Sequence, residues 1–108
     1  MSAPDAVALL DPAAVLAAAG DPVRLALLRA LAAHAPQSVA DLAGHVQRPA
    51  DGVSKHLRIL RAARVITAVT PADTDGRKQY YEIPTLFRSR DTAGRTVLDF
   101  GAVAVRLD

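Results

Sequence analysis

The sequence has 108 residues, a formal net charge of +2, 51% hydrophobic residues and no cysteine. A chain of this length forms one domain with a single core, and the lack of cysteine excludes disulfides, thiolate metal sites and cysteine nucleophiles. No apolar run reaches the roughly 20 residues of a membrane helix, and Asp5 stands where a secretory signal has Lys or Arg, so we expect a cytoplasmic protein.

Two aspartate–proline pairs predict the first helices. Asp11 and Asp21 each precede a proline, and an acid that caps a helix fits a proline in its first turn. The first helix is predicted over Pro12–Ala19 and the second from Pro22 to about Ala35. Residues 1–20 therefore form a helical arm in this prediction.

Two further helices follow with only a short connection between them. The third is predicted from Ser38, whose hydroxyl can cap it, to about Val46. The fourth is predicted from about Pro49 to Ala63. A short helix joined by a tight turn to a second, amphipathic helix indicates a helix-turn-helix unit.

The fourth helix has an apolar side and a basic side. Val53, Leu57 and Leu60 form one stripe at helical spacing, while Lys55 and Arg58 project from the opposite side. Residues 48–64 carry five bases and one acid, a local charge of +4. This pattern suits a helix that enters the DNA major groove, which is about 12 Å wide. The alternative from charge alone is a solvated helix face.

The periodicity changes from helix to strand after Arg64. Residues 65–70 and 78–83 predict two strands, joined by a turn over residues 71–76. Residues 85–94 fit either a short helix or a loop, and Thr96–Leu107 reads as extended, with a bend or bulge at Gly101. The predicted fold class is mainly α with a small β-hairpin wing, a winged helix-turn-helix with an extra C-terminal strand.

Four segments in this order resemble one protein family. Gly20–Leu28, Ser38–Ala43, Val53–Ile66 and Gly76–Tyr81 are together similar to the ArsR-type winged-helix repressors of bacteria. The most specific stretch is VSKHLRILRAARVI, which resembles the family pattern V-S-x-H-L-x-x-L-x-x-A-G-L-V. Arg64 stands where glycine is usual in that pattern, and the resemblance covers about residues 12–84.

The resemblance implies roles for particular side chains. The fourth helix would be the recognition helix, and two subunits would place a pair of them in successive major grooves. Asp51, Ser54 and Lys55 are then the candidates for base edges. The candidates for phosphate or flanking minor-groove contacts are polar or basic: Gln37, Ser38, Arg58 and Arg61, and on the wing Arg77 and Lys78.

Some of these residues have a structural alternative. Arg61 could instead complement the C-terminal end of the helix dipole, and His56 is expected to pack in the core. His34, His45 and His56 fall on three different elements, so we expect no metal site and no cofactor. A small-molecule effector remains open, without a class that the sequence specifies.

The sequence thus predicts three parts and one function. Residues 1–20 are a dimerisation arm, 21–84 a DNA-binding core, and 85–108 a strand-forming extension associated with the dimer. The predicted function is a homodimeric, sequence-specific repressor that binds double-stranded DNA at a pseudo-palindromic operator. The alternative is a winged-helix module that binds another protein instead of DNA. No catalytic motif is found, so we expect no enzyme activity.

Overall fold

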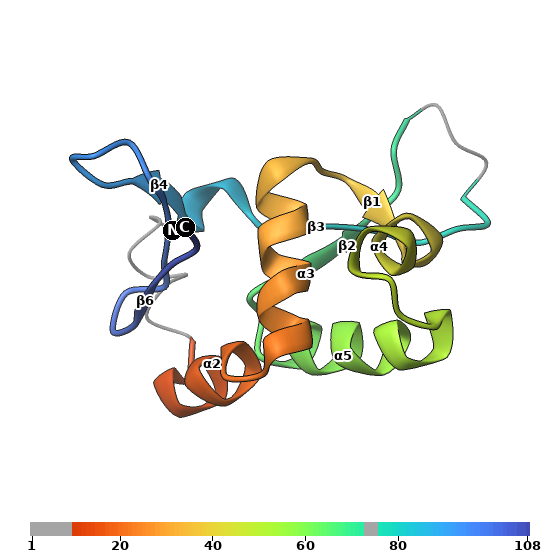
Figure 1. The fold of residues 1–108 in the computed structure, drawn as a ribbon, viewed down its shortest axis with the longest axis horizontal. Helices are drawn as coiled ribbons and strands as arrows, with labels where there is room; N and C mark the ends of the chain where they lie inside the picture. The colour runs from red at the N-terminus through yellow and green to blue at the C-terminus, as the bar shows by residue number, and fades with distance from the viewer. Residues whose placement is uncertain (1–9, 73–75) are drawn as a thin grey trace.

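The computed structural model describes residues 10–72 and 76–108, so residues 1–9 of the predicted arm and 73–75 of the predicted turn lie outside it (Figure 1). The helices are α2 (Pro12–Ala19), α3 (Pro22–Ala33), α4 (Val39–Val46) and α5 (Ala50–Ala62), with a 3-10 turn η1 (Thr85–Phe87). The strands are β1 (Gln37–Ser38), β2 (Thr67–Val69), β3 (Tyr80–Glu82), β4 (Arg88–Arg90), β5 (Thr96–Asp99) and β6 (Ala104–Arg106).

The helix starts follow the predicted capping residues. The Asp11 carboxylate accepts a hydrogen bond from the backbone N–H of Ala13 at 3.1 Å. Asp21 accepts two, from the N–H groups of Val23 at 2.9 Å and Arg24 at 3.0 Å. These bonds satisfy backbone donors that the first turn of a helix leaves without partners.

The recognition-helix candidate α5 ends in a left-handed residue. Arg64 has φ +67°, and its N–H donates to the Arg61 carbonyl at 2.9 Å while the Val65 N–H donates to the Leu60 carbonyl at 3.2 Å. These two bonds define a Schellman motif, in which the left-handed position is usually occupied by glycine. Val65 and Leu60 are both buried, which completes the apolar contact of that motif.

Helix α3 runs through the middle of the molecule. Figure 1 shows it between the wing, formed by β2 and β3, and the C-terminal strands on the other side. One apolar cluster holds all these parts together, including Leu27 and Leu31 of α3, Leu57 of α5 and Leu98 of β5. Residues 10–20 of the predicted arm and the C-terminal segment both contribute side chains to this cluster, together with the helix-turn-helix unit.

The wing is a small antiparallel sheet with the strand order β1-β3-β2. Ala68 pairs with Tyr81 in the β2–β3 hairpin, and Gln37 pairs with Tyr81 on the other edge of β3. The hairpin was predicted, but strand β1 was not, because two residues are too few to show a strand period. The short β1 ties the start of α4 to the wing.

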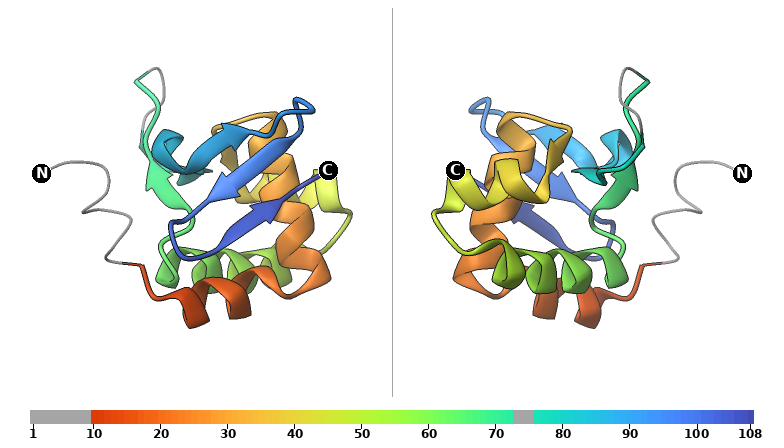
Figure 2. Two further views of the ribbon diagram at one scale, coloured as in Figure 1. Left: turned by 90° about the vertical axis from the view of Figure 1, so that its left-hand side faces the viewer. Right: turned by 90° about the vertical axis from the view of Figure 1, so that its right-hand side faces the viewer.

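The C-terminal segment forms a second antiparallel sheet, with the order β4-β5-β6 (Figure 2). The sequence predicted one extended segment over Thr96–Leu107, whereas the structure has two strands with a turn between them. Gly101 lies in this turn with φ +96°, and its N–H donates to the Asp99 carboxylate at 2.9 Å. Phe87 and Phe100, with ring centroids 5.0 Å apart, anchor this sheet to the core.

Among the described residues, no helix has both the length and the apolar character that a membrane crossing requires.

Candidate nucleic-acid interface

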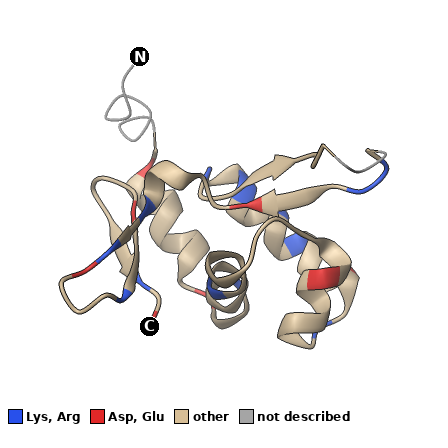
Figure 3. Cartoon of the chain, turned by 90° about the horizontal axis from the view of Figure 1, so that it is seen from above, with Lys and Arg blue, Asp and Glu red and all other residues tan. Residues whose placement is uncertain are grey.

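The position of α5 follows from its apolar stripe. Val53, Leu57 and Leu60 are buried, as their spacing predicts, and they contribute to the central cluster. Burial of this stripe leaves Lys55 and Arg58 exposed on the other side. Figure 3 shows basic positions on α5 and on the loop of the wing just before β3.

A polar contact holds α5 against α3. Nη1 of the Arg24 guanidinium donates to His56 Nδ1 at 3.1 Å. Its Nε donates to the Ala18 carbonyl at 2.6 Å and its Nη2 to the Ala17 carbonyl at 3.2 Å, both at the end of α2. Arginine has no acceptor, so His56 Nδ1 accepts this bond. The contact joins three helices, and it directs His56 toward α3.

Asp21 lies beside the same contact. Its carboxylate oxygen is 3.8 Å from His56 Nδ1. The backbone N–H of Arg24 donates to this carboxylate and holds the pKa of Asp21 below its ordinary value, with the nearby Arg24 charge acting in the same direction. The acid that starts α3 is therefore ionised at neutral pH.

The outer face of α5 carries cations that are not neutralised. Lys55, Arg58 and Arg61 are exposed, and none of their side chains forms a hydrogen bond or ion pair with a residue in the ranges 10–72 and 76–108. Asp51 is exposed in the first turn of the same helix. Charged side chains in this state keep their full hydration, and they can exchange it for contacts with an anionic partner.

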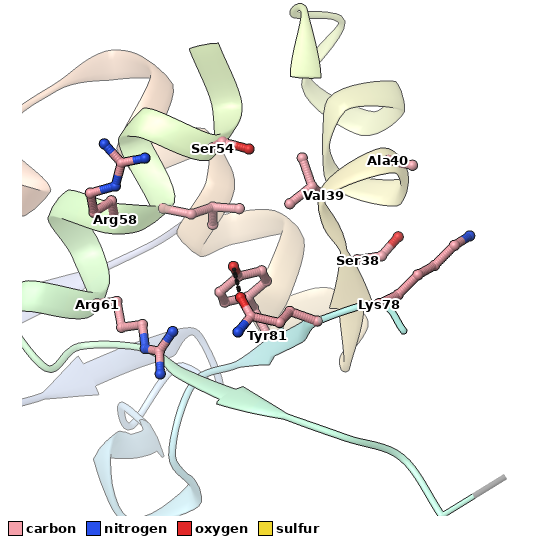
Figure 4. Close-up of a pocket in the computed structure, with 10 residues that line it drawn as sticks. Ser38, Val39, Ala40, Ser54, Arg58, Arg61, Lys78 and Tyr81 are labelled. Atoms are coloured by element: carbon pink, nitrogen blue, oxygen red, sulfur yellow. Dashed lines mark hydrogen bonds between the residues drawn. The ribbon is translucent and has the colours of Figure 1, made fainter. Parts of the chain in front are cut away.

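A hollow of about 540 Å³ separates α5 from the start of α4 and from the wing (Figure 4). Ser54, Arg58 and Arg61 line it from α5, and Lys78 lines it from the chain before β3. Tyr81, at the floor, was not singled out as a site residue. Its hydroxyl donates to the Gln79 side-chain oxygen at 2.9 Å. The sequence signal that could have identified Tyr81 is its alternation with Tyr80 along the strand, which turns one of the two rings inward.

The structure buries Gln37, which was predicted to contact phosphate. Its side chain is only 1% exposed, because the amide nitrogen donates to the carbonyls of Ala30 at 3.0 Å and His34 at 2.6 Å. These bonds fix the end of α3 to strand β1. Gln37 is therefore a structural residue.

Ser38 caps α4 as predicted. Its hydroxyl accepts from the Asp41 N–H at 3.2 Å, and the Asp41 carboxylate accepts from the Ser38 N–H at 3.0 Å, so the two residues form a capping box. The Ser38 N–H lowers the pKa of Asp41, and the Ser38 hydroxyl lowers it further. Ser38 also lines the hollow, although it is only 5% exposed.

The wing candidates are accessible. Arg77 and Lys78 are both exposed and lie just before β3. Lys78 is close enough to Asp41 to contribute to the lowering of its pKa. The structure therefore brings Lys78 next to the start of α4 and to the hollow beside α5.

The structure holds no grouping of metal ligands within the residues that it describes. The three histidines are separated, and His45 Nδ1 is bonded to the Asp41 backbone carbonyl at 3.0 Å. His56 is bonded to Arg24.

The chain is similar to known helix-turn-helix proteins in sequence and in structure. The family model of a helix-turn-helix domain matches residues 19–69. A possible transcriptional regulator for arsenical resistance is 33% identical, with a TM-score of 0.55 over 65% of this chain and 68% of that chain. NolR from Sinorhizobium fredii is 27% identical, with a TM-score of 0.58 over 76% of this chain and 73% of its own.

A third solved structure is similar over a comparable length. It is an ArsR-like transcriptional regulator from Rhodococcus sp. RHA1, 29% identical, with a TM-score of 0.58 over 77% of this chain and 69% of that chain. No curated protein sequence gives a significant match.

Proposed function

Because the chain belongs to the ArsR family of winged helix-turn-helix transcriptional regulators, we propose that it is a sequence-specific DNA-binding repressor that acts as a homodimer. The observation that carries the proposal is the exposed face of α5, where Lys55, Arg58 and Arg61 have no counterion among the described residues. A row of free cations on a rigid helix is the electrostatic footprint of a polyanion site. Of the three similar structures described above, two are named as transcriptional regulators, and we propose no catalytic role for this chain.

The leading half of α5 would read the bases. Lys55 can donate to guanine O6 and N7, and Asp51 can accept from cytosine N4. Ser54 can bond to either kind of edge. An acid close to DNA lowers affinity unless it makes such a bond, so Asp51 would act on sequence preference.

The remaining cations would hold the sugar-phosphate backbone. Arg58 and Arg61 lie further along α5, and Arg77 and Lys78 reach out from the wing. Ser38 lines the same hollow and would add a polar contact at the start of α4. Such contacts position the protein on the duplex and carry no base sequence information.

The second subunit would pack against the arm. Leu16 on the outer side of α2 is 58% exposed, and Ala13 and Ala17 on the same helix are also exposed. An apolar helix side of this kind suits a subunit contact. The C-terminal sheet, on another side of α3, would add to it. A two-fold dimer binds half-sites about one helical turn, roughly 10 to 10.5 base pairs, apart or a multiple of it.

The proposal is tested by DNA retention and by stoichiometry. Purified protein is mixed with fragmented genomic DNA at low salt, retained fragments are sequenced, and light scattering measures the mass of the complex. Arg58→Ala should weaken retention. Arg106→Ala removes an exposed charge from β6, away from α5, and should leave retention unchanged as long as light scattering shows that the dimer is intact. Failure to retain any fragment would refute DNA binding and favour the protein-interaction alternative. Equal retention by the two variants would refute α5 as the interface.

A further inference from the structure

A second cavity lies at the other end of α5, where that helix meets β2 and η1. It has a volume of about 310 Å³. Its apolar lining comes from Leu10, Ile66, Pro84 and Phe87, and its charged lining from Arg61 and Arg64. Ile66 and Phe87 are buried, while the two arginines are exposed, so the cavity has an apolar interior and a basic rim.

Arginine is an unexpected residue at position 64, because the backbone there is left-handed. Its φ of +67° is a conformation that L-residues disfavour and glycine adopts freely. Arg64 occupies the position of the Schellman motif where glycine is the common residue. The turn itself therefore does not explain an arginine here, and the guanidinium is what this residue adds over glycine.

The charge at the rim has no counterion in the described residues. Neither the Arg61 nor the Arg64 guanidinium forms a hydrogen bond or ion pair with a described residue, and no acidic side chain lines the cavity. Figure 4 shows the Arg61 side chain directed away from Ser54, toward the strand side of α5. Two guanidinium groups next to an apolar space match an anion with an apolar body, because arginine binds carboxylates with paired hydrogen bonds.

The size of the cavity limits the ligand. Small-molecule sites span about 300 to 1,000 Å³, so this cavity lies at the small end of that range. A single aromatic ring or short hydrocarbon with one carboxylate is of the appropriate size. The cavity touches both the end of α5 and η1, which leads into the C-terminal sheet.

We propose that this cavity binds a small organic carboxylate, with Arg64 and Arg61 on the carboxylate and Ile66 and Phe87 around its apolar part. The site is distinct from the DNA-facing hollow, although Arg61 borders both. Its existence does not depend on the proposed DNA binding. The alternative is that both arginines only complement the carbonyl end of α5.

Phenylacetate and its neutral amide, phenylacetamide, test the proposal on the protein without DNA. Ligand-observed NMR and thermal denaturation follow binding at millimolar concentration, with benzoate and hexanoate as further carboxylates. Arg64→Gly is the decisive variant, because glycine suits the left-handed backbone and loss of folding does not confound the result. Arg48→Ala is the matched control, since it removes an exposed arginine that does not line the cavity.

The expected result is that phenylacetate binds the wild type and the control, that Arg64→Gly weakens this binding about tenfold or more, and that the amide does not bind. Thr67→Glu, at an exposed position of the rim, should also abolish binding by repulsion. Absence of binding by all three carboxylates overturns the proposal. So does equal binding of acid and amide, or unchanged binding in Arg64→Gly.

Discussion

Replacement of Arg64 by glycine is predicted to stabilise the fold. The left-handed backbone costs an L-residue about 1 to 2 kcal/mol, and glycine does not incur this cost. Glycine gives the unfolded chain more freedom, which offsets about 0.4 to 1 kcal/mol of the gain. The net increase in the free energy of unfolding is therefore about 0 to 1.6 kcal/mol, and its middle value of about 0.8 kcal/mol raises Tm by roughly 3 to 6 °C for a domain of this size.

The measurement is urea denaturation together with a thermal scan, at a fixed protein concentration because a dimer would make Tm concentration-dependent. Arg64→Ala is the control, since it removes the same guanidinium but keeps the backbone cost. We expect the alanine variant to be no more stable than the wild type. If glycine gives no increase over alanine, the reasoning from φ is refuted. An alanine variant that is less stable than the wild type would show separately that the Arg64 side chain stabilises the end of α5.

Three further predictions concern the helices of the interface. Gly52→Ala should raise Tm, because nothing lies within 4 Å of the added methyl group and alanine exceeds glycine by up to about 1 kcal/mol in a helix; a lower Tm would contradict this. Arg58→Ala should reduce the steepness of the log–log plot of DNA affinity against salt concentration by about 0.9. Lys55→Ala should reduce discrimination between bases at one base pair by about 1 to 3 kcal/mol. Unchanged values in a binding titration would contradict the roles of Arg58 at phosphate and Lys55 at a base. Asp41→Asn should lower the free energy of unfolding at neutral pH. Because the folded-state pKa of Asp41 is lowered, the difference in stability between the variant and the wild type should shrink as pH falls below about 4. A difference that does not depend on pH would show that the Asp41 charge contributes nothing.

The apolar pattern predicted the helices well because their packing follows local periodicity. Val53, Leu57 and Leu60 form the buried stripe of α5 that their spacing indicated. The aspartates before Pro12 and Pro22 cap α2 and α3, because a cap bonds to backbone within its own turn. Features that depend on three or four neighbouring residues were thus available from the sequence.

Features that depend on contacts between distant segments were not. Gln37 lies in a polar stretch next to a helix start, yet carbonyl groups of α3 bind its amide and bury it. The arginine–histidine contact between Arg24 and His56 joins residues 32 positions apart, and no spacing rule predicts it. The sequence of the C-terminal segment would read as extended whether it formed one long strand or two paired strands. Only the pairing of β5 with β6 shows that the chain reverses at Gly101.

At each end of α5, one residue is less favourable for stability than another residue that would fit the same position. Gly52 lies in the first turn, where alanine would fit, and Arg64 lies in the left-handed position, where glycine would fit. The two sites are 12 residues, or about 18 Å, apart along the helix axis, so their effects should add. The double variant Gly52→Ala/Arg64→Gly should therefore gain the sum of the two single gains in denaturation. We expect it to lose phenylacetate binding through Arg64 and to keep the salt dependence of DNA binding set by Arg58. A double variant that is more stable and unchanged in both kinds of binding would show that neither residue serves a ligand.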